Sequence, residues 1–438
     1  MRVYLDTVGC RLNQAEIEVM ARQFRADGHV MAASAASADL AVINTCAVTN
    51  DAASESRRRI RHMARAGVEE IVVTGCWATL QPQAAAALPG VTRVVANDRK
   101  EDLAGSTFAR RSAPPSEFEL EPLARQPLPG LHHRTRAFIK IQDGCNNHCT
   151  FCVTTIARGE ARSRTQLEVL ADIRFALAGG AREIVLTGVH LGSWGLDLGS
   201  NLRRLVAAVL LETDVPRLRL SSLEPWDLDA EFFALWEDPR LMPHLHLPLQ
   251  SGCAATLKRM RRQTTPASFR ALVSAARRVM PEAAITTDII AGFPGETQAE
   301  FAESLNFVRE MGFAGGHVFT YSQRPGTGAA RMRGQIRPEL RKERNHVLHQ
   351  TLEASAESYR KRFVGRRLSV LWESTSELGD SGWQMQGLSG NYLRVSAPAP
   401  SPRWNEIDEV ELIESGPAGM QGVLCPEPAE ARGFGSEG

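Results

Sequence analysis

Three cysteines are crowded into the segment DGCNNHCTFC, which runs from residue 143 to residue 152. Cys145, Cys149 and Cys152 follow a C-x3-C-x2-C spacing, and three thiols this close cannot all pair with one another as disulfides. Zinc sites use four protein ligands, or three and a water, and often contain a C-x2-C pair. Cysteine thiolates are also the usual ligands of iron–sulfur clusters, and three of them would leave one iron of a four-iron cube open. The spacing therefore predicts a metal centre in this segment.

A second set of cysteines is dispersed through the N-terminal part of the chain. Cys10, Cys46 and Cys76 each come directly after a β-rich run that ends VYLDTVG, LAVINT or IVVTG. The carboxyl ends of parallel strands lie along one edge of a sheet, so these distant residues can converge there. Gly9 and Gly75 precede two of them and allow tight turns close to a bulky ligand. Any one of these cysteines alone is better explained as a small buried residue, but their shared position favours a second metal centre.

The elements that must position both sets form three predicted domains. Residues 1–107 alternate between β-rich and helical stretches, which predicts an N-terminal parallel α/β domain. Its expected strands are 2–8, 39–45, 70–75 and 91–96, and its expected helices include 13–27 and 50–66. Residues 108–134 contain five prolines and no clean period, which predicts a linker.

From residue 135 to residue 363 the chain repeats a strand followed by a helix, which predicts an open, partial (βα)6 barrel. Active sites in such folds lie at the carboxyl ends of the strands. The expected strands are 137–142, 183–189, 217–223, 244–249, 285–291 and 316–321, and the expected helices include 164–178, 297–310 and one long helix at 336–363.

The remainder of the chain changes character. Residues 364–425 read as short strands and predict a small β-barrel, whereas residues 426–438 are rich in Pro, Gly and Glu and predict a disordered tail. The overall fold class is therefore α/β with a small C-terminal β-barrel.

Composition limits the class of protein. The chain has 438 residues, of which 43% are hydrophobic and 23% charged, and its formal net charge is +1, which argues against a purely electrostatic nucleic-acid binder. It has no apolar run long enough to span a bilayer and no sign of a signal peptide, so we expect a cytoplasmic protein with reduced thiols. Eight cysteines in such a chain point to metal binding or catalysis. Cys253 and Cys425 have no partners by spacing and are interpreted as structural or incidental.

The segment DGCNNHCTFC, with an aromatic residue before its last cysteine, resembles the signature of radical S-adenosylmethionine (SAM) enzymes. The resemblance implies that Cys145, Cys149 and Cys152 hold a 4Fe-4S cluster whose open iron is chelated by SAM. An electron then splits SAM to a 5′-deoxyadenosyl radical. It also implies that Phe151 lies near the adenine.

With the dispersed cysteines and the terminal barrel, the chain resembles the methylthiotransferase family over about residues 1–425. The matching motifs are GCRLNQAE, NTCAVTN, TGCWA, DGCNNHCTFC, ARGEARSR, HLPLQSG, GFPGET and YSQRPGTGAA. The resemblance implies two 4Fe-4S clusters, SAM as both radical source and methyl donor, a sulfur donor, and a reductant such as flavodoxin or ferredoxin. The terminal barrel is similar to the TRAM domain, an RNA-binding module. Trp77 and Cys253 depart mildly from the family pattern, which usually has Tyr and Ser there.

The segments NTCAVTNDAASESRR and YSQRPGTGAARMRGQI most resemble the branch that acts on N6-threonylcarbamoyladenosine next to the tRNA anticodon. Other branches modify isopentenyl-adenosine in tRNA or an aspartate of a ribosomal protein, and both stay as alternatives. An alternative from another class is a non-catalytic, metal-binding RNA-binding protein with zinc at residues 145–152.

Further residues are candidates for SAM or substrate contacts because they lie at predicted strand ends. They are Ser222, Glu224, Gln250, Ser251, Asp288, Gly292 and Gly295, each of which could instead be a cap or turn residue. Arg158, Arg162 and Arg164 could bind a carboxylate or a phosphate, or could form a solvated helix start. Basic stretches at 56–65, 258–262 and 340–367 favour contact with RNA. Trp383 and Tyr392 are candidates for stacking on bases or for core packing.

Overall fold

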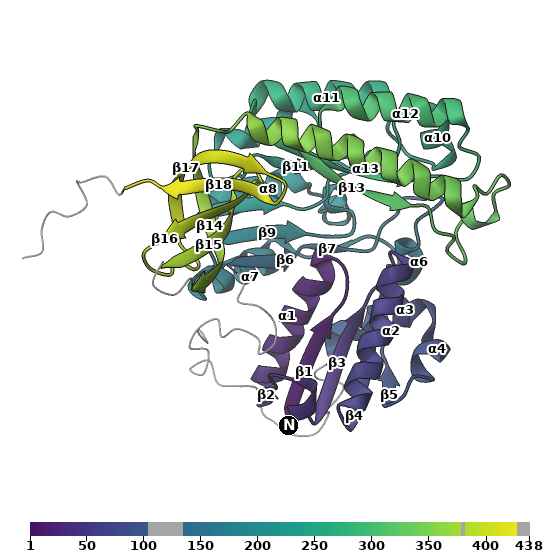
Figure 1. Ribbon diagram of the computed structural model, residues 1–438. Helices are drawn as coiled ribbons and strands as arrows, with labels where there is room; N and C mark the ends of the chain where they lie inside the picture. The colour runs from purple at the N-terminus through teal and green to yellow at the C-terminus, as the bar shows by residue number, and fades with distance from the viewer. Residues whose placement is uncertain (104–134, 378–381, 427–438) are drawn as a thin grey trace, which may run out of the picture.

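The computed structural model describes residues 1–103, 135–377 and 382–426 (Figure 1). An N-terminal α/β unit packs against one side of a larger α/β unit, and an all-β unit packs against the end of the larger one. The predicted linker at 108–134 and, apart from its first residue, the predicted tail at 426–438 lie outside the described residues. The predicted limits 1–107, 135–363 and 364–425 remain our proposed domain boundaries. Within the described part, no helix is both long and apolar enough to cross a membrane.

The N-terminal unit is a parallel sheet with strand order β2-β1-β3-β4-β5. Its strands are β1 (Arg2–Thr7), β2 (Val30–Met31), β3 (Leu40–Thr45), β4 (Glu70–Gly75) and β5 (Val91–Val94), and its helices are α1 (Arg11–Ala26), α2 (Asn50–Arg65), α3 (Cys76–Leu80) and α4 (Pro82–Ala86). The predicted strands and helices are confirmed, and the short edge strand β2 was missed. Alternate residues of β3 pack toward α1 (Leu40, Val42) and toward α2 (Ala41, Ile43), so both faces of the sheet are covered.

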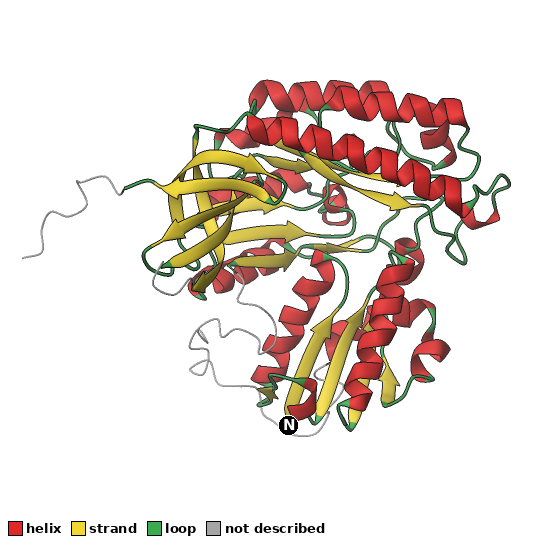
Figure 2. Ribbon diagram, viewed as in Figure 1, coloured by secondary structure: helices red, strands yellow, loops and turns green. Residues whose placement is uncertain are grey.

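The central unit is the predicted open barrel of parallel strands (Figure 2). Its strands are β6 (Arg136–Lys140), β9 (Glu183–Thr187), β10 (Arg217–Leu220), β11 (His244–His246), β12 (Ala284–Ala291) and β13 (Gly315–Thr320). Its helices are α6 (Thr154–Arg158), α7 (Gln166–Ala178), α8 (Leu202–Glu212), α9 (Ala230–Phe233), α10 (Ala254–Arg259), α11 (Pro266–Val279), α12 (Gln298–Met311) and α13 (Pro338–Lys361). Isolated parallel bridges, Leu218 to Leu241 and Ser222 to His246, join its two three-stranded sheets. In the described residues β13 does not pair with β6, so the barrel is open.

A small hairpin, β7 (Gln142–Asp143) with β8 (Arg162–Ser163), brackets the segment that carries Cys145, Cys149 and Cys152. It was not predicted, because two-residue strands leave no periodic signal in a sequence. The hairpin fixes both ends of the cysteine-bearing loop at the carboxyl end of the first barrel strand.

The C-terminal unit is a closed barrel with strand order β14-β15-β16-β18-β17, as predicted. Its strands are β14 (Arg367–Glu377), β15 (Trp383–Ser389), β16 (Arg394–Ala399), β17 (Ile407–Gly416) and β18 (Gly419–Leu424). Trp372 is fully buried in its core and donates its indole N–H to Asp408 at 2.6 Å. Trp383 is half-buried and packs against the same core.

A buried ion cluster attaches this barrel to the central unit. Glu183 has no exposed surface and lies 3.1 and 2.9 Å from the guanidinium groups of Arg217 and Arg219. Burial acts to raise the pKa of Glu183, but the charges of Arg219 and Arg217 outweigh it and hold this pKa at about 2. The same arginines donate to the carbonyl oxygens of residues 388–390 over distances of 3.1–3.3 Å. One carboxylate thus orients both side chains that hold the terminal barrel.

Tyr392 is the point at which all three units meet. Its ring stacks on His244 of β11, with the ring centroids 4.0 Å apart and the planes 7° from parallel. The guanidinium of Arg11, which follows Cys10, donates to the tyrosine hydroxyl at 2.5 Å. Arg219 covers the ring at 5.0 Å from its centroid. Of the two predicted uses of Tyr392, packing rather than base stacking is therefore the one found.

We predict that Glu183→Ala lowers the free energy of unfolding by about 3–5 kcal/mol, because it leaves two buried guanidinium groups without a counter-charge. Denaturant unfolding followed by tryptophan fluorescence measures the change. Arg203→Ala is the matched control, since Arg203 and its partner Glu231 have side chains that are 43% and 73% exposed. Its effect should stay within about 0.5 kcal/mol, and equal losses in the two variants would contradict the role of Glu183.

Candidate metal centres

The structure brings Cys10, Cys46 and Cys76 to one edge of the N-terminal sheet. Thr7 of β1 is in register with Asn44, and Thr45 of β3 with Gly75, so the strands that precede the three cysteines end together. Cys46 and Cys76 are buried, whereas Cys10 lies at the surface and starts α1.

The thiols of Cys10 and Cys76 both lie close enough to Cys46 to influence its pKa. Burial is the main cause that raises the pKa of Cys46 to about 11, and the neighbouring thiols of Cys10 and Cys76 add to the increase. Desolvation also raises the pKa of Cys10, although its residue is exposed at the surface. Thiols with raised pKa values hold their protons until a cation compensates the thiolate charge, as a bound metal does.

Glycine is required beside two of these cysteines. Gly9 has φ of 101°, and a Cβ there would lie 2.5 Å from the Cys46 sulfur. Gly75 has φ of 95°, and a Cβ there would meet the backbone of Thr45. Both positions are disfavoured for other residues by their backbone angles as well. The two glycines therefore let the turns that carry Cys10 and Cys76 close over Cys46.

The barrel cysteines sit on a tight loop directly after β7. The amide of Cys145 donates to the carbonyl of Gly159 at 3.1 Å, and the amide of Cys152 to that of Cys149 at 3.0 Å. Each sulfur also receives an N–H donor: Asn147 N to Cys145 at 3.4 Å, Thr154 N to Cys152 at 3.3 Å and Arg262 Nη1 to Cys149 at 3.8 Å. Burial raises the pKa of Cys149 to about 11, and Arg262 opposes this.

Two sets of three thiols, each supported by donors or by glycine turns, fit the ligand chemistry of iron–sulfur clusters. In the described ranges, no three or more His, Cys, Asp or Glu side chains are grouped closely enough to surround a single metal ion. Ligands of a four-iron cube bind different irons and do not need that close grouping. The donor sets therefore suit a cluster, with one thiolate for each of three irons.

The candidate SAM contacts are partly brought together by the structure. Ser222 bridges to His246, and His246 donates to Asp288 at 3.2 Å. His317 donates to the same carboxylate at 3.1 Å, and burial only partly offsets the effect of both histidines, which keep the pKa of Asp288 well below its usual range. Gln250 pairs with β12 and has φ of 67°, a strained conformation for a residue other than glycine. Together these residues line the strand ends where a ligand is expected.

Other candidates have partners that limit what they can bind. The carboxylate of Glu224 is held by Arg262 in two contacts of 3.1 and 2.5 Å. Gly292 has φ of 72° and lies against the side chain of Arg341, which favours its role as a turn. Phe151 packs edge-on against Phe293, with ring centroids 6.5 Å apart, and forms part of an apolar cluster beside the cysteine loop.

The two expectations for Arg158 were both wrong. The residue is neither a solvated helix start nor free to bind an added carboxylate, because it is buried in contacts with Glu16 and Asp143. Arg162 is exposed on β8, and Arg164 pairs with Asp172 at 2.7 Å. The burial of Arg158 could not be predicted from the sequence, because its partners come from other segments of the chain.

His190 was missed and belongs to the barrel centre. It follows β9, contacts the Cys145 sulfur and lies 2.7 Å from Asp227. Although burial would lower its pKa, the carboxylate of Asp227 and the sulfur raise the pKa of His190 to about 10. The strand-end rule that located the cysteines would also have located this histidine.

Comparisons with known proteins agree with this arrangement. Two family models match the chain: uncharacterized protein family UPF0004 over residues 2–96 and the radical SAM superfamily over residues 139–308. The chain is 34% identical to threonylcarbamoyladenosine tRNA methylthiotransferase MtaB of Bacillus subtilis (strain 168), over 94% of each chain. It is 38% identical to the protein of that name from Thermotoga maritima, over 85% of this chain and 86% of the relative.

A further relative and a solved structure complete the comparison. The chain is 36% identical to tRNA-2-methylthio-N(6)-dimethylallyladenosine synthase of Acidothermus cellulolyticus, over 94% of this chain and 85% of the relative. It resembles the structure of the radical SAM methyltransferase TsrM from Kitasatospora setae with a TM-score of 0.57, over 75% of each chain, at 16% identity. That likeness concerns the fold alone.

We predict that replacing Cys10, Cys46 and Cys76 together by alanine removes about half of the bound iron, while cleavage of SAM continues because the barrel cysteines are intact. Iron and zinc analysis of anaerobically prepared protein measures the loss. Cys253→Ala is the control, since Cys253 is buried and donates to Glu303 at 3.1 Å. An unchanged iron content in the triple variant, or zinc in place of iron, would contradict the cluster assignment.

Proposed function

Because this chain belongs to the radical SAM methylthiotransferase family, we propose that it converts N6-threonylcarbamoyladenosine next to the tRNA anticodon to its 2-methylthio derivative. Cys145, Cys149 and Cys152 hold the cluster that binds SAM. Cys10, Cys46 and Cys76 hold the cluster through which sulfur passes. When bound, the two clusters and SAM supply the radical, the sulfur and the methyl group.

One contact supports the choice of substrate branch. The two segments that most resemble the threonylcarbamoyladenosine branch, 44–58 and 321–336, touch each other beside Cys46. Arg324 donates to Asn50 at 2.6 Å and to the carbonyl of Val48 at 2.9 Å, and Asn50 donates to Ser322 at 2.7 Å. Segments that characterise a substrate branch are expected to border the place where that substrate is bound.

The N-terminal unit and the polar side chains at the strand ends enclose the site. The edge of the N-terminal sheet covers the cysteine loop of the partial barrel, as the contact between α3 and α6 shows. Covering the strand ends limits the access of water to the barrel cysteines, which protects reactive species formed there. Asp288, His246 and His317 provide polar groups toward the barrel opening.

Part of the predicted basic surface is available for RNA. On α2, Arg61 is exposed, whereas Arg58 and Arg59 both pair with Glu55. The expected patch at 258–262 is reduced, because Arg259 is held by Glu300 and Arg262 is buried against Glu224, whereas Lys258 and Arg261 are exposed. The basic stretch at 340–367 does not form one continuous basic surface, since Arg344 is buried with Glu296. We propose that RNA is contacted by α2, by the exposed residues Lys258 and Arg261, by the last turns of α13 and by the terminal barrel.

The proposed reductant, sulfur donor and cellular location follow from the family resemblance. We propose a reductant such as flavodoxin or ferredoxin, a separate sulfur donor and a cytoplasmic location, in keeping with eight cysteines that are all free thiols. The alternatives of the same family are isopentenyl-adenosine in tRNA, which the Acidothermus relative supports by its name, and an aspartate of a ribosomal protein. The alternative of another class, a zinc-dependent RNA-binding protein without catalysis, differs from the proposal in that it requires bound zinc and no iron.

We predict that tRNA from a strain that lacks this protein contains no 2-methylthio-N6-threonylcarbamoyladenosine and accumulates the unmodified precursor. Mass spectrometry of digested tRNA nucleosides measures both. Complementation with the wild-type chain should restore the product, whereas the Cys145→Ala variant should not. Loss of the 2-methylthio derivative of isopentenyl-adenosine alone would transfer the assignment to that branch, and unchanged nucleosides would exclude tRNA as the substrate.

A further inference from the structure

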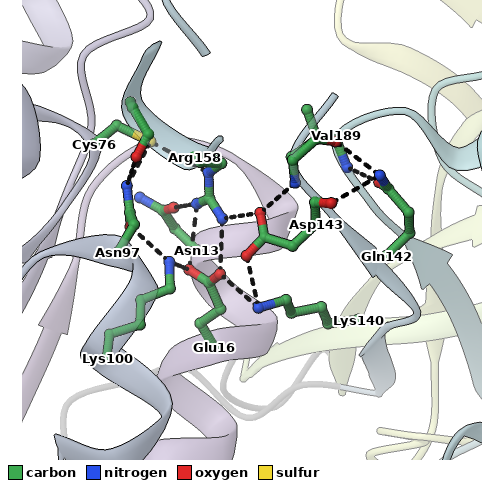
Figure 3. A network of polar contacts seen from close by, with 12 residues as sticks. Asn13, Glu16, Cys76, Asn97, Lys100, Lys140, Gln142, Asp143, Arg158 and Val189 are labelled. Atoms are coloured by element: carbon green, nitrogen blue, oxygen red, sulfur yellow. Dashed lines mark hydrogen bonds and ion pairs between the residues drawn. The ribbon is translucent and has the colours of Figure 1, made fainter. Parts of the chain in front are cut away.

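Arg158 lies where the two candidate metal centres meet. It is the last residue of α6, which begins two residues after Cys152, and its side chain is 2% exposed. Figure 3 shows the guanidinium of Arg158 between Cys76 on one side and the carboxylates of Glu16 and Asp143 on the other. One guanidinium thus connects the loop of the barrel cysteines to a cysteine of the N-terminal set.

Carboxylates and an amide fix the two terminal nitrogens of this guanidinium. Nη1 donates to Glu16 at 2.8 Å and to Asp143 at 2.9 Å. Nη2 donates to Asn13 Oδ1 at 2.8 Å and to Glu16 at 3.3 Å. Because the guanidinium is planar, these contacts also fix the direction of its remaining N–H group.

That remaining group points at sulfur. Nε of Arg158 donates to Sγ of Cys76 over 3.3 Å, and the Asn97 amide donates to the same sulfur at 3.7 Å. Asn97 also donates to the carbonyl of Ala157 at 2.8 Å, so α6 holds both donors in place. On the opposite side, Asn13 accepts from the Cys10 thiol at 3.8 Å. The network therefore touches two of the three N-terminal thiols.

We propose that Arg158 is a positioning residue that sets the reduction potential of the N-terminal cluster through its contact with Cys76. This inference rests on the proposed function, since it requires a cluster on Cys10, Cys46 and Cys76. Hydrogen bonds to ligand sulfur and nearby positive charge stabilise the reduced form of a cluster and so raise its potential. The same side chain is anchored to Asp143, two residues before Cys145, so the electronic environment of one centre depends on the loop that holds the other.

Glu16 acts on the same cluster with the opposite sign. It is buried beside Arg158 and also pairs with Lys100 at 2.6 Å. Its negative charge acts against the addition of an electron nearby. If this junction had a purely structural role, substitutions of Arg158 and Glu16 would lower the stability of the protein without shifting the reduction potential in opposite directions.

We predict opposite shifts of the potential for Arg158→Lys and Glu16→Gln. Lysine keeps the charge, but its ammonium group is captured by the two carboxylates and loses the N–H directed at Cys76, so the potential becomes more negative. Glutamine keeps the size of Glu16 and removes its charge, so the potential becomes less negative. Redox titration followed by electron paramagnetic resonance measures both in full-length protein in which Cys145, Cys149 and Cys152 are alanine, so that one cluster remains.

Arg344→Lys is the matched control. Arg344 is also buried and pairs with a buried glutamate, Glu296, at 2.7 Å, but its contacts include no cysteine, so the potential should not change. An unchanged potential in Arg158→Lys would overturn the inference, and so would an unchanged potential in Glu16→Gln if Arg158→Lys cannot retain iron. Absence of iron from the parent protein with the three alanines would instead refute the proposed function.

Discussion

The carboxyl ends of the N-terminal sheet have to lie against the cysteine loop of the partial barrel, and the rest of the molecule depends on this constraint. The contact is made by a buried ionic junction in which Arg158 joins Glu16 of α1 to Asp143 beside the loop. A buried charge that loses its partner is costly, so such a junction tolerates few other orientations of the two units. This junction holds the two sets of cysteines near each other. Cys10 and Cys76 lie on the side of the N-terminal unit, and Cys145 lies on the side of the barrel.

The sequence allowed most of the fold and both sets of thiols to be predicted. Parallel strands bring their carboxyl ends to one edge, so three cysteines that follow three β-rich runs could be placed together before any coordinates were known. The barrel strands were equally accessible, because strands such as β12 and helices such as α12 alternate with clear turn signals between them. Short elements without periodicity, β2 and the β7–β8 hairpin, could not be found in this way.

Charged residues were harder to interpret than cysteines. Arg158, Arg262 and Arg344 lie in basic stretches that look solvated, yet each is buried with a carboxylate from a distant part of the chain. Burial of a cation depends on tertiary partners, and neither spacing nor composition reveals these. Tyr392 is a similar case: a stacking role was open from its type, and only the fold shows that His244 occupies one face of its ring.

The contact between Arg11 and Tyr392 also orders events during protein synthesis. The two residues are 381 positions apart, so the ribosome has released the entire N-terminal sheet and the partial barrel before the tyrosine emerges. Domains fold largely as they are made, and until then nothing from the terminal barrel covers the side of the sheet edge next to Cys10. The residues of the first cysteine set are therefore made, and can come together with the partial barrel, before the terminal barrel can contact Arg11.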